Sequence, residues 1–166
     1  MSTSLVSLAS LVNAFNPVTP QLRVAAIIVR GTQILLVEHR KRGEHYWVLP
    51  GGRLEGLETL EAALRRELNE ELSLDARVGQ LVLVSEMLAP DRHVVNLMFH
   101  AEIGEEAEPR LDPADPVLAG WQWVSTDQLP RLDFRPPIAD AVLAVIAEKF
   151  SGPVRVLGDT WKPQPR

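Results

Sequence analysis

The segment from Pro50 to Leu74, PGGRLEGLETLEAALRRELNEELSL, constrains the fold more than any other part of the chain. Its proline and two glycines interrupt regular structure and predict a loop. Residues 58–72 then consist of strong helix formers, with a leucine at every fourth position. The segment therefore predicts a glycine-containing loop followed by an amphipathic helix whose leucines face the core.

Three glutamates of this helix, Glu67, Glu70 and Glu71, share one face. At about 100° per residue, Glu67 and Glu71 lie about 40° apart, and Glu70 lies about 60° to the other side of Glu67. On the same wheel, Glu71 falls between Leu60 and Leu64, inside the apolar stripe, where a solvated glutamate is not expected. Like charges at this spacing also repel one another, by about 0.2–0.5 kcal/mol for each pair.

A divalent cation explains this arrangement, because Mg²⁺ is bound by a few carboxylates together with substrate phosphates. Gly51 and Gly52 let the backbone approach a cation or phosphate closely, and the positive end of the helix points toward their loop. Arg66 lies beside the acids and can hold a carboxylate in place. The competing interpretation is an ordinary solvated face with salt bridges.

The remaining pattern predicts a mixed sheet flanked by helices. Two β-rich runs separated by Arg30-Gly31 predict a hairpin, and the basic stretch 39–46 that follows is expected to be flexible. Trp121 and Trp123 alternate on one short strand and are expected in the core or an interface. A second helix is expected after Pro137. The predicted elements, in order, are strands at 22–29 and 34–39, the helix at 58–72, strands at 78–88, 93–103 and 120–124, and the last helix.

The chain divides by this pattern into an N-terminal extension (1–21), one domain (22–150) and a C-terminal tail (151–166) expected to be loosely ordered. Leu5, Leu8, Leu11, Val12 and Phe15 have helical spacing in the extension. The extension has no basic residue, so a secretory leader is not expected.

Composition narrows the function classes. The 166 residues carry a formal net charge of −5, which disfavours binding to duplex nucleic acid or to an anionic membrane by bulk charge. No stretch has the length of a membrane-spanning helix. The absence of cysteine excludes disulfides, thiolate zinc sites and a cysteine nucleophile. We expect a cytoplasmic protein. If it handles a phosphorylated ligand, a metal and a few local basic residues must offset the repulsion between the negative charges.

The same segment resembles the Nudix box, G-x5-E-x7-R-E-U-x-E-E-x-G-U, in which U is a bulky aliphatic residue. The sequence departs from the box at Ser73, which stands where the box has its last glycine, and Leu57 replaces a glycine common before the first glutamate. The upstream WVLPGG and Glu55 also match the lead-in usual for the family. The residues in register are Gly52, Glu58, Arg66, Glu67, Leu68, Glu70, Glu71 and Leu74.

The resemblance implies an α/β fold, the Nudix-type α/β/α sandwich with a mixed β-sheet. It implies a hydrolase that cleaves a nucleoside diphosphate linked to another moiety, with Mg²⁺ (or Mn²⁺) as cofactor. Glu70 and Glu71 would bind the metal, Glu67 would be a further ligand or a base, and the Gly51 carbonyl would join them. Arg66 would orient the acids, and Glu58 would be structural.

Residues around the box are candidates for contacting a nucleotide-like substrate. Arg40 and Arg42 precede the glycine loop, while Gly52 and Arg53 lie in it, so these residues are predicted to bind the substrate. Tyr46 and Phe134 are weaker candidates for stacking on a base. In several members of the family a later loop supplies another glutamate as base or ligand. The acidic residues of the matching loop here, among which the sequence does not choose, are Glu105, Glu106, Glu108, Asp112 and Asp115.

Two other functions stay open from the sequence. A house-cleaning hydrolase of (deoxy)nucleoside triphosphates would carry the same box, because substrate choice lies in loops outside it. A non-catalytic Nudix-like module would bind a nucleotide as a sensor, although the retained Glu67, Glu70 and Glu71 speak against it. Homodimerisation is an expectation from the family alone.

Overall fold

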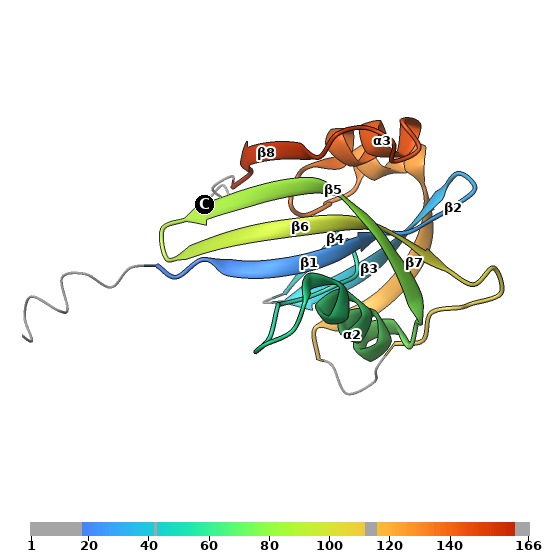
Figure 1. Ribbon diagram of the computed structural model, residues 1–166, viewed down its shortest axis with the longest axis horizontal. Helices are drawn as coiled ribbons and strands as arrows, with labels where there is room; N and C mark the ends of the chain where they lie inside the picture. The colour runs from blue at the N-terminus through green and yellow to red at the C-terminus, as the bar shows by residue number, and fades with distance from the viewer. Residues whose placement is uncertain (1–17, 42, 112–115, 162–166) are drawn as a thin grey trace, which may run out of the picture.

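The computed structural model describes residues 18–41, 43–111 and 116–161 (Figure 1). The residues expected to form an N-terminal helix, together with Arg42, Asp112 and Asp115, lie outside these ranges. The elements, in chain order, are β1 (Gln21–Ile27), β2 (Val29–Arg30), β3 (Gln33–Lys41), β4 (Glu44–Val48), α2 (Leu60–Leu72), β5 (Ala76–Ala89), β6 (Arg92–Ile103), β7 (Leu118–Ser125), the short 3₁₀ helix η1 (Thr126–Arg131), α3 (Ala139–Ala147) and β8 (Arg155–Asp159).

The strands form two sheets. The larger has the order β1-β6-β5-β8, in which β1 runs parallel to β6, β6 antiparallel to β5, and β5 parallel to β8. In the smaller sheet β3 pairs antiparallel with β2 and β4, and also with β7. The two sheets meet where the Leu35 N–H donates to the Ile28 carbonyl at 3.0 Å. The larger sheet is therefore mixed, as the sequence predicts.

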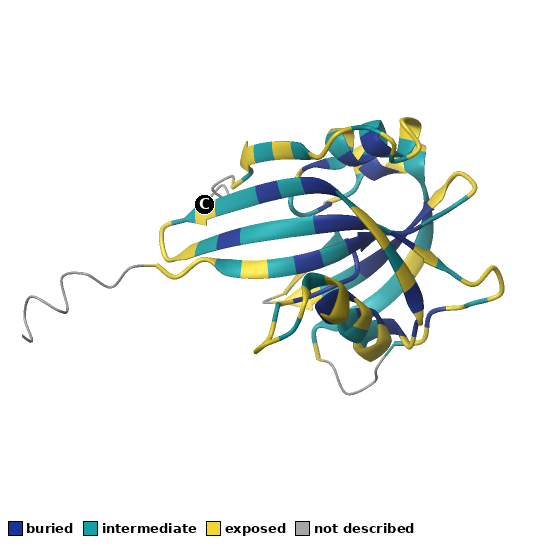
Figure 2. Ribbon diagram, viewed as in Figure 1, coloured by how far each residue is buried: buried dark blue, intermediate teal, exposed yellow. Residues whose placement is uncertain are grey.

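Two buried clusters lie on opposite faces of these strands. Val24 and Ala26 of β1 belong to the cluster beneath α2, whereas Ile27, one residue further, belongs to the cluster beneath α3. Successive residues of a strand point to opposite faces, so α2 and α3 cover different sides of the sheet. Figure 2 shows both helices over the same half of the molecule. This arrangement confirms the predicted α/β/α sandwich.

Helix α2 forms as its sequence predicts, with sharper limits. Thr59 caps it, because its Oγ1 accepts from the Ala62 N–H at 3.1 Å, so the helix begins at Leu60 rather than at residue 58. Leu64, Leu68 and Leu72 are fully buried. The helix ends at Ser73, which adopts the left-handed conformation (φ 54°) that the missing glycine of the box would favour.

The predicted hairpin across Arg30-Gly31 is only partly right. Two residues, β2, pair with β3 in that hairpin. The preceding seven residues, β1, instead pair with β6 in the other sheet. Both runs are rich in apolar and β-branched residues, and local pattern does not identify which distant strand each run pairs with.

Two other expectations are wrong. The basic stretch 39–46 is not a flexible loop, because it contributes to the antiparallel pair β3–β4, with Gly43 at positive φ in the turn. The tail beyond Ser151 is not loose throughout its described part, because Arg155–Asp159 form β8. Strand β8 extends the sheet alongside β5, and the Leu88 N–H donates to Asp159 Oδ1 at 3.0 Å.

The tryptophan prediction is confirmed: Trp121 and Trp123 are partly buried and pack against the cluster beneath α2. The second helix also forms, as α3, which ends at Ala147; beyond it the Phe150 ring stacks on His100. No helix in the described part of the chain is long and apolar enough to cross a membrane.

Replacing Ser73 with glycine tests the end of α2. A serine at positive φ is strained and a glycine is not, so Ser73→Gly is expected to raise the free energy of unfolding by about 0.5–1 kcal/mol. Urea unfolding measures this as a higher midpoint at an unchanged slope. The matched change Ala62→Gly, at an exposed position within the helix, should lower stability by about 1 kcal/mol. Equal effects of the two changes would contradict the assignment.

Candidate functional site

The glycine loop is fixed against the edge of β1. The Val24 N–H donates to the Gly52 carbonyl and the Ala26 N–H to the Pro50 carbonyl, each at 2.9 Å. Gly51 has a φ of 136°, and a Cβ there would overlap the carbonyl oxygen of Val24. Only glycine tolerates both conditions. The backbone of the loop is therefore held along β1, and it forms one side of the site.

Two glutamates of helix α2 contact the backbone of this loop. The Glu71 carboxylate accepts from the Gly51 N–H at 3.0 Å. The Glu67 carboxylate lies against the α-carbon of Gly52 so closely that a Cβ there would overlap it. The position of Glu71 in the apolar stripe is thus explained, because it faces the loop across the helix–strand contact. A polar partner there satisfies one of its oxygens.

The guanidinium of Arg66 connects the loop and the helix. It bonds both carboxylate oxygens of Glu58, at 3.1 Å from Nε and 2.8 Å from Nη2. The Nη2 also donates to the Arg53 carbonyl at 3.1 Å. The Nη1 donates to Glu67 and Glu70, each at 3.1 Å. Arginine alone among side chains offers this many donors in a planar fork.

The carboxylates around Arg66 differ in exposure. The Glu67 side chain is 13% exposed, Glu58 18% and Glu70 59%. Burial raises the pKa of Glu67 above its ordinary value, and the bond from Arg66 only partly opposes this. The bond from Arg66 holds the pKa of Glu58 below its ordinary value, as does the Glu55 N–H. The carboxylates in turn raise the pKa of Arg66. The pKa of Glu67 is therefore shifted toward neutrality.

The donor set suits a hard divalent cation, although the acids are not gathered into a ready centre. Among the residues described, no three Asp, Glu or His side chains lie close enough together to hold a metal. Glu67 and Glu70 are joined through Arg66, and Glu71 is held by Gly51. All three offer carboxylate oxygens, and Gly52 leaves room where any side chain would displace Glu67. These residues fit Mg²⁺, which takes oxygen ligands and keeps several waters.

The predicted substrate arginines are not all at this site. Arg53 is exposed in the loop, and its carbonyl is bonded by Arg66. Arg40 is exposed in β3, opposite His45, toward the turn of the β3–β4 hairpin rather than beside the glycine loop. Arg42 lies outside the described residues. The stacking candidate Tyr46 is covered by the Arg135 guanidinium, 4.4 Å from its ring centre, and Phe134 is buried in the core.

The later acidic loop carries one ion pair. Glu108 pairs with Arg30 at 3.0 Å, and Arg30 also donates to the Ala107 carbonyl and lies over the Trp123 ring. Glu105 and Glu106 are exposed. Glu108 thus ties its loop to β2, so its first role here is structural.

Sequence reasoning missed Arg23. It lies on β1, its Nη2 donates to the Gly51 carbonyl at 3.4 Å, and its charge lowers the pKa of Glu67. Asn96 of β6 lies in register beside Arg23, and Ser85 of β5 lies in register beside Asn96. The Asn96 amide donates to the Ser85 hydroxyl at 3.4 Å. Residues in register share a face, so a polar row crosses the sheet on the α3 side. The signal was a lone charge within the apolar run LRVAAIIV.

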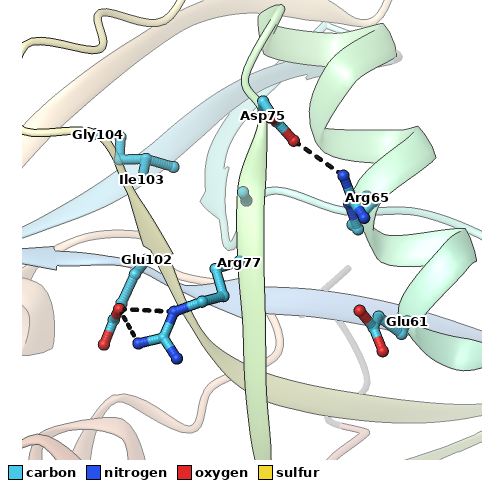
Figure 3. A pocket seen from close by; sticks show the side chains of 8 residues that line it. Glu61, Arg65, Asp75, Arg77, Glu102, Ile103 and Gly104 are labelled. Carbon is cyan, nitrogen blue, oxygen red and sulfur yellow. Dashed lines mark hydrogen bonds and ion pairs between the residues drawn. The ribbon is translucent and has the colours of Figure 1, made fainter.

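A hollow of about 460 Å³ lies on another side of α2, between its Arg65 side and the ends of β5 and β6 (Figure 3). Arg65 points to Asp75, and Arg77 to Glu102, as ion pairs. The hollow has no lining residue in common with the carboxylate set. Because both of its arginines already face carboxylates, it is a poor site for phosphate.

Comparison with known proteins bears on the fold and the family of the chain. The family model of the NUDIX domain matches residues 19–145. The phosphatase NudJ of Escherichia coli K12 is 28% identical over 142 residues, covering 84% of this chain and 92% of NudJ. The crystal structure of the MutT NUDIX hydrolase from Burkholderia pseudomallei is 30% identical, with a TM-score of 0.65 over 76% of this chain and 98% of that one. An ADP-ribose pyrophosphatase from Streptococcus suis shares the fold at 20% identity, with a TM-score of 0.64 over 85% of this chain and all of that one.

Gly52→Ala tests the contact between the loop and Glu67. The added methyl group would overlap the Glu67 carboxylate and displace it, so phosphoanhydride hydrolysis should fall by about 100-fold, as expected for misplacement of a reacting group. Gly104→Ala is the matched control, because its nearest neighbour would be the Ala107 Cβ at 3.9 Å. The steady-state rate of hydrolysis is measured for both variants. Equal activity in the two would contradict the contact between Gly52 and Glu67.

Glu67→Gln tests the burial of that carboxylate. The pKa of Glu67 is raised in the folded state, so its contribution to stability is full below its ordinary value of 4.5 and is lost as pH rises through the raised pKa. The neutral variant should therefore be more stable than the parent near pH 7, with a difference that vanishes below pH 4.5. Thermal unfolding in EDTA across this range measures it. A variant less stable at pH 7 would refute the assignment.

Proposed function

The chain belongs to the Nudix hydrolase family, and from this premise we propose that it cleaves a nucleoside diphosphate linked to another moiety, such as an ADP-ribose-like compound, with Mg²⁺. It is a hydrolase acting on pyrophosphate bonds. Members of the family act on nucleotide-like small molecules and generally use divalent metal ions. The choice of compound and of metal is the proposal.

One observation carries the proposal: the acids of α2 and the backbone of the glycine loop are in direct contact. The Glu71 carboxylate accepts a hydrogen bond from the Gly51 N–H, and the Glu67 carboxylate packs against the α-carbon of Gly52. A structural helix face would turn such acids to solvent. Here they point to a glycine backbone, so a cation held by them would lie against backbone that carries no side chains.

The residues that would hold the cation are Glu67, Glu70, Glu71 and the Gly51 carbonyl. When bound, Mg²⁺ lowers the pKa of a water and neutralises charge on the diphosphate oxygens. Mn²⁺ offers the same chemistry with the same oxygen ligands. Arg66 keeps Glu67 and Glu70 on the loop side of the helix through its bonds to both, and Glu58 in turn fixes Arg66.

Glu67 has the environment of a general base. Its pKa is shifted toward neutrality by burial, which is how enzymes adapt a carboxylate to accept a proton near pH 7. In this role Glu67 takes a proton from the water that attacks phosphorus, and the P–O bond to the leaving phosphate breaks. Service as a further metal ligand is the alternative role for the same side chain.

The substrate would extend from the loop across the sheet. Arg53 of the loop and Arg23 of β1 are paired in an isolated antiparallel bridge. Both would meet phosphate oxygens of the substrate. Arg40 of β3 and Arg42, which lies outside the described residues, stay candidates for phosphate contact from the sequence alone. On the α3 side of the sheet, Arg23 and Asn96 offer hydrogen-bonding groups for the nucleoside, and the fully buried Ser85 accepts from the Asn96 amide.

A nucleotide panel distinguishes the proposal from its alternatives. Incubation with Mg²⁺ and chromatography of the products should yield AMP and a sugar phosphate from ADP-ribose. A nucleoside monophosphate and pyrophosphate from triphosphates would instead indicate the house-cleaning activity. Tight binding with no turnover of any compound would indicate a non-catalytic module and refute the proposal.

Glu71→Gln is expected to abolish turnover while the fold is kept. The amide still accepts from the Gly51 N–H, but it lacks the charge that a divalent cation requires. Glu61→Gln is the matched control, an exposed glutamate in the first turn of the same helix, and it should keep full activity. Activity and calorimetric Mg²⁺ binding are measured for both, with circular dichroism to check the fold. Unchanged turnover in Glu71→Gln would defeat the site assignment.

A further inference from the structure

The half of the larger sheet that lies beyond α2 carries exposed apolar side chains on the α2 side. Leu22 of β1 is 38% exposed, Leu88 of β5 45%, and Val156 of β8 71%. Figure 2 shows α2 and α3 over the other half of the molecule, with this half mostly in the colours of intermediate and exposed residues.

The strand registers place these residues on one face. Val24, which packs beneath α2, is in register with Leu97, then Val84, then Val156. The next row toward the β5–β6 turn runs from Leu22 through Val95 to Glu86. Leu88 follows Glu86 on the same face, by alternation along the strand. We call this set the bare face; it consists of Leu22, Val84, Leu88, Val95 and Val156.

Few charges interrupt the bare face. On it, Glu86 and His93 bond each other at 3.0 Å. Polar groups used in the functional site lie elsewhere, because Arg23, Asn96 and Ser85 point to the opposite face of the same strands. An apolar area beside a helix that already covers the rest of the layer is suited to a second helix.

The chain contains a matching segment next to the bare face. Residues 5–15, which lie outside the described residues, have Leu5, Leu8, Leu11, Val12 and Phe15 at helical spacing, and no charged residue precedes Arg23. Strand β1 begins at Gln21, one residue before Leu22. Five residues, 16–20, join the segment to β1, and can span up to about 17 Å.

The dimensions also match. Eleven residues in a helix extend about 16 Å, and four strands about 4.8 Å apart span about 14 Å. A helix of this length crosses all four strands from β1 to β8. From these observations we propose that residues 5–15 form a helix that packs on the bare face of the same molecule, extending the layer begun by α2.

A spin label tests this in the full chain. The protein has no cysteine, so Ser10→Cys gives a single labelling site, and on a helix Ser10 lies opposite the apolar stripe. Labelled protein should lose most of its amide signal intensity at Leu22, Leu88 and Val156 in proton–nitrogen correlation spectra. Gly31, exposed in the turn between β2 and β3, should keep its intensity, because Figure 1 shows that turn at the other end of the molecule from the β5–β6 turn. Intensity kept at the bare face, or lost equally at Gly31, would overturn the proposal.

Two controls identify the occupant. Leu8→Asp combined with the label should restore the intensity at the bare face, whereas Asn13→Asp, on the outer side of the helix, should not. A mixture of isotope-labelled protein without a spin label and spin-labelled protein at natural abundance should show no loss. Loss in the mixture would indicate a segment from a second copy, and persistence of the loss in Leu8→Asp would indicate contact without the apolar stripe. Either result would overturn the proposal.

Discussion

The bonds of the Arg66 guanidinium are the interaction on which the rest of the site depends. They join the loop before α2, through Glu58 and the Arg53 carbonyl, to the acids of the helix, through Glu67 and Glu70. A lysine could not replace it, because an ammonium group lacks the planar fork that satisfies Glu58 with two bonds. The arginine also provides the positive charge that reduces repulsion among the acids.

This arrangement holds functional groups at some expense of stability. Glu67 is buried where its charged form is disfavoured, and Gly51 has a backbone conformation that only glycine adopts readily. The fully buried leucines of α2 offset these terms, because they anchor the same helix to the core. A cation bound by Glu67 and Glu70 would compete with Arg66 for their oxygens, so the proposed function requires Arg66 to share or release these contacts.

The spacing of residue types along the chain was sufficient to predict the elements that depend on near neighbours in the sequence. The helix and the common face of its acids follow from a 3.6-residue period, and both are present. Strand partners do not follow from period two, so the pairing of β1 with β6 was not predicted. Strand β8 was missed because prolines near it suggested a loose tail, yet its pairing with β5 overrides that preference. Arg23 was missed because its contact with Gly51 joins residues 28 positions apart in the sequence, and a local pattern does not reveal such a contact.

The alternation along β1 explains how one strand serves both the site and the rest of the layer. Arg23 points to the face where Asn96 and Ser85 continue a polar row, while Leu22 and Val24 point to the face where α2 packs. A shift of one residue in register would exchange the two faces, burying a charge under α2 and placing apolar residues where Arg23 now bonds the glycine loop. The seven paired positions between β1 and β6 hold that register, and they thereby fix the position of the glycine loop, which bonds the other edge of β1. The geometry of the site is therefore set by a strand pairing far from the Nudix box.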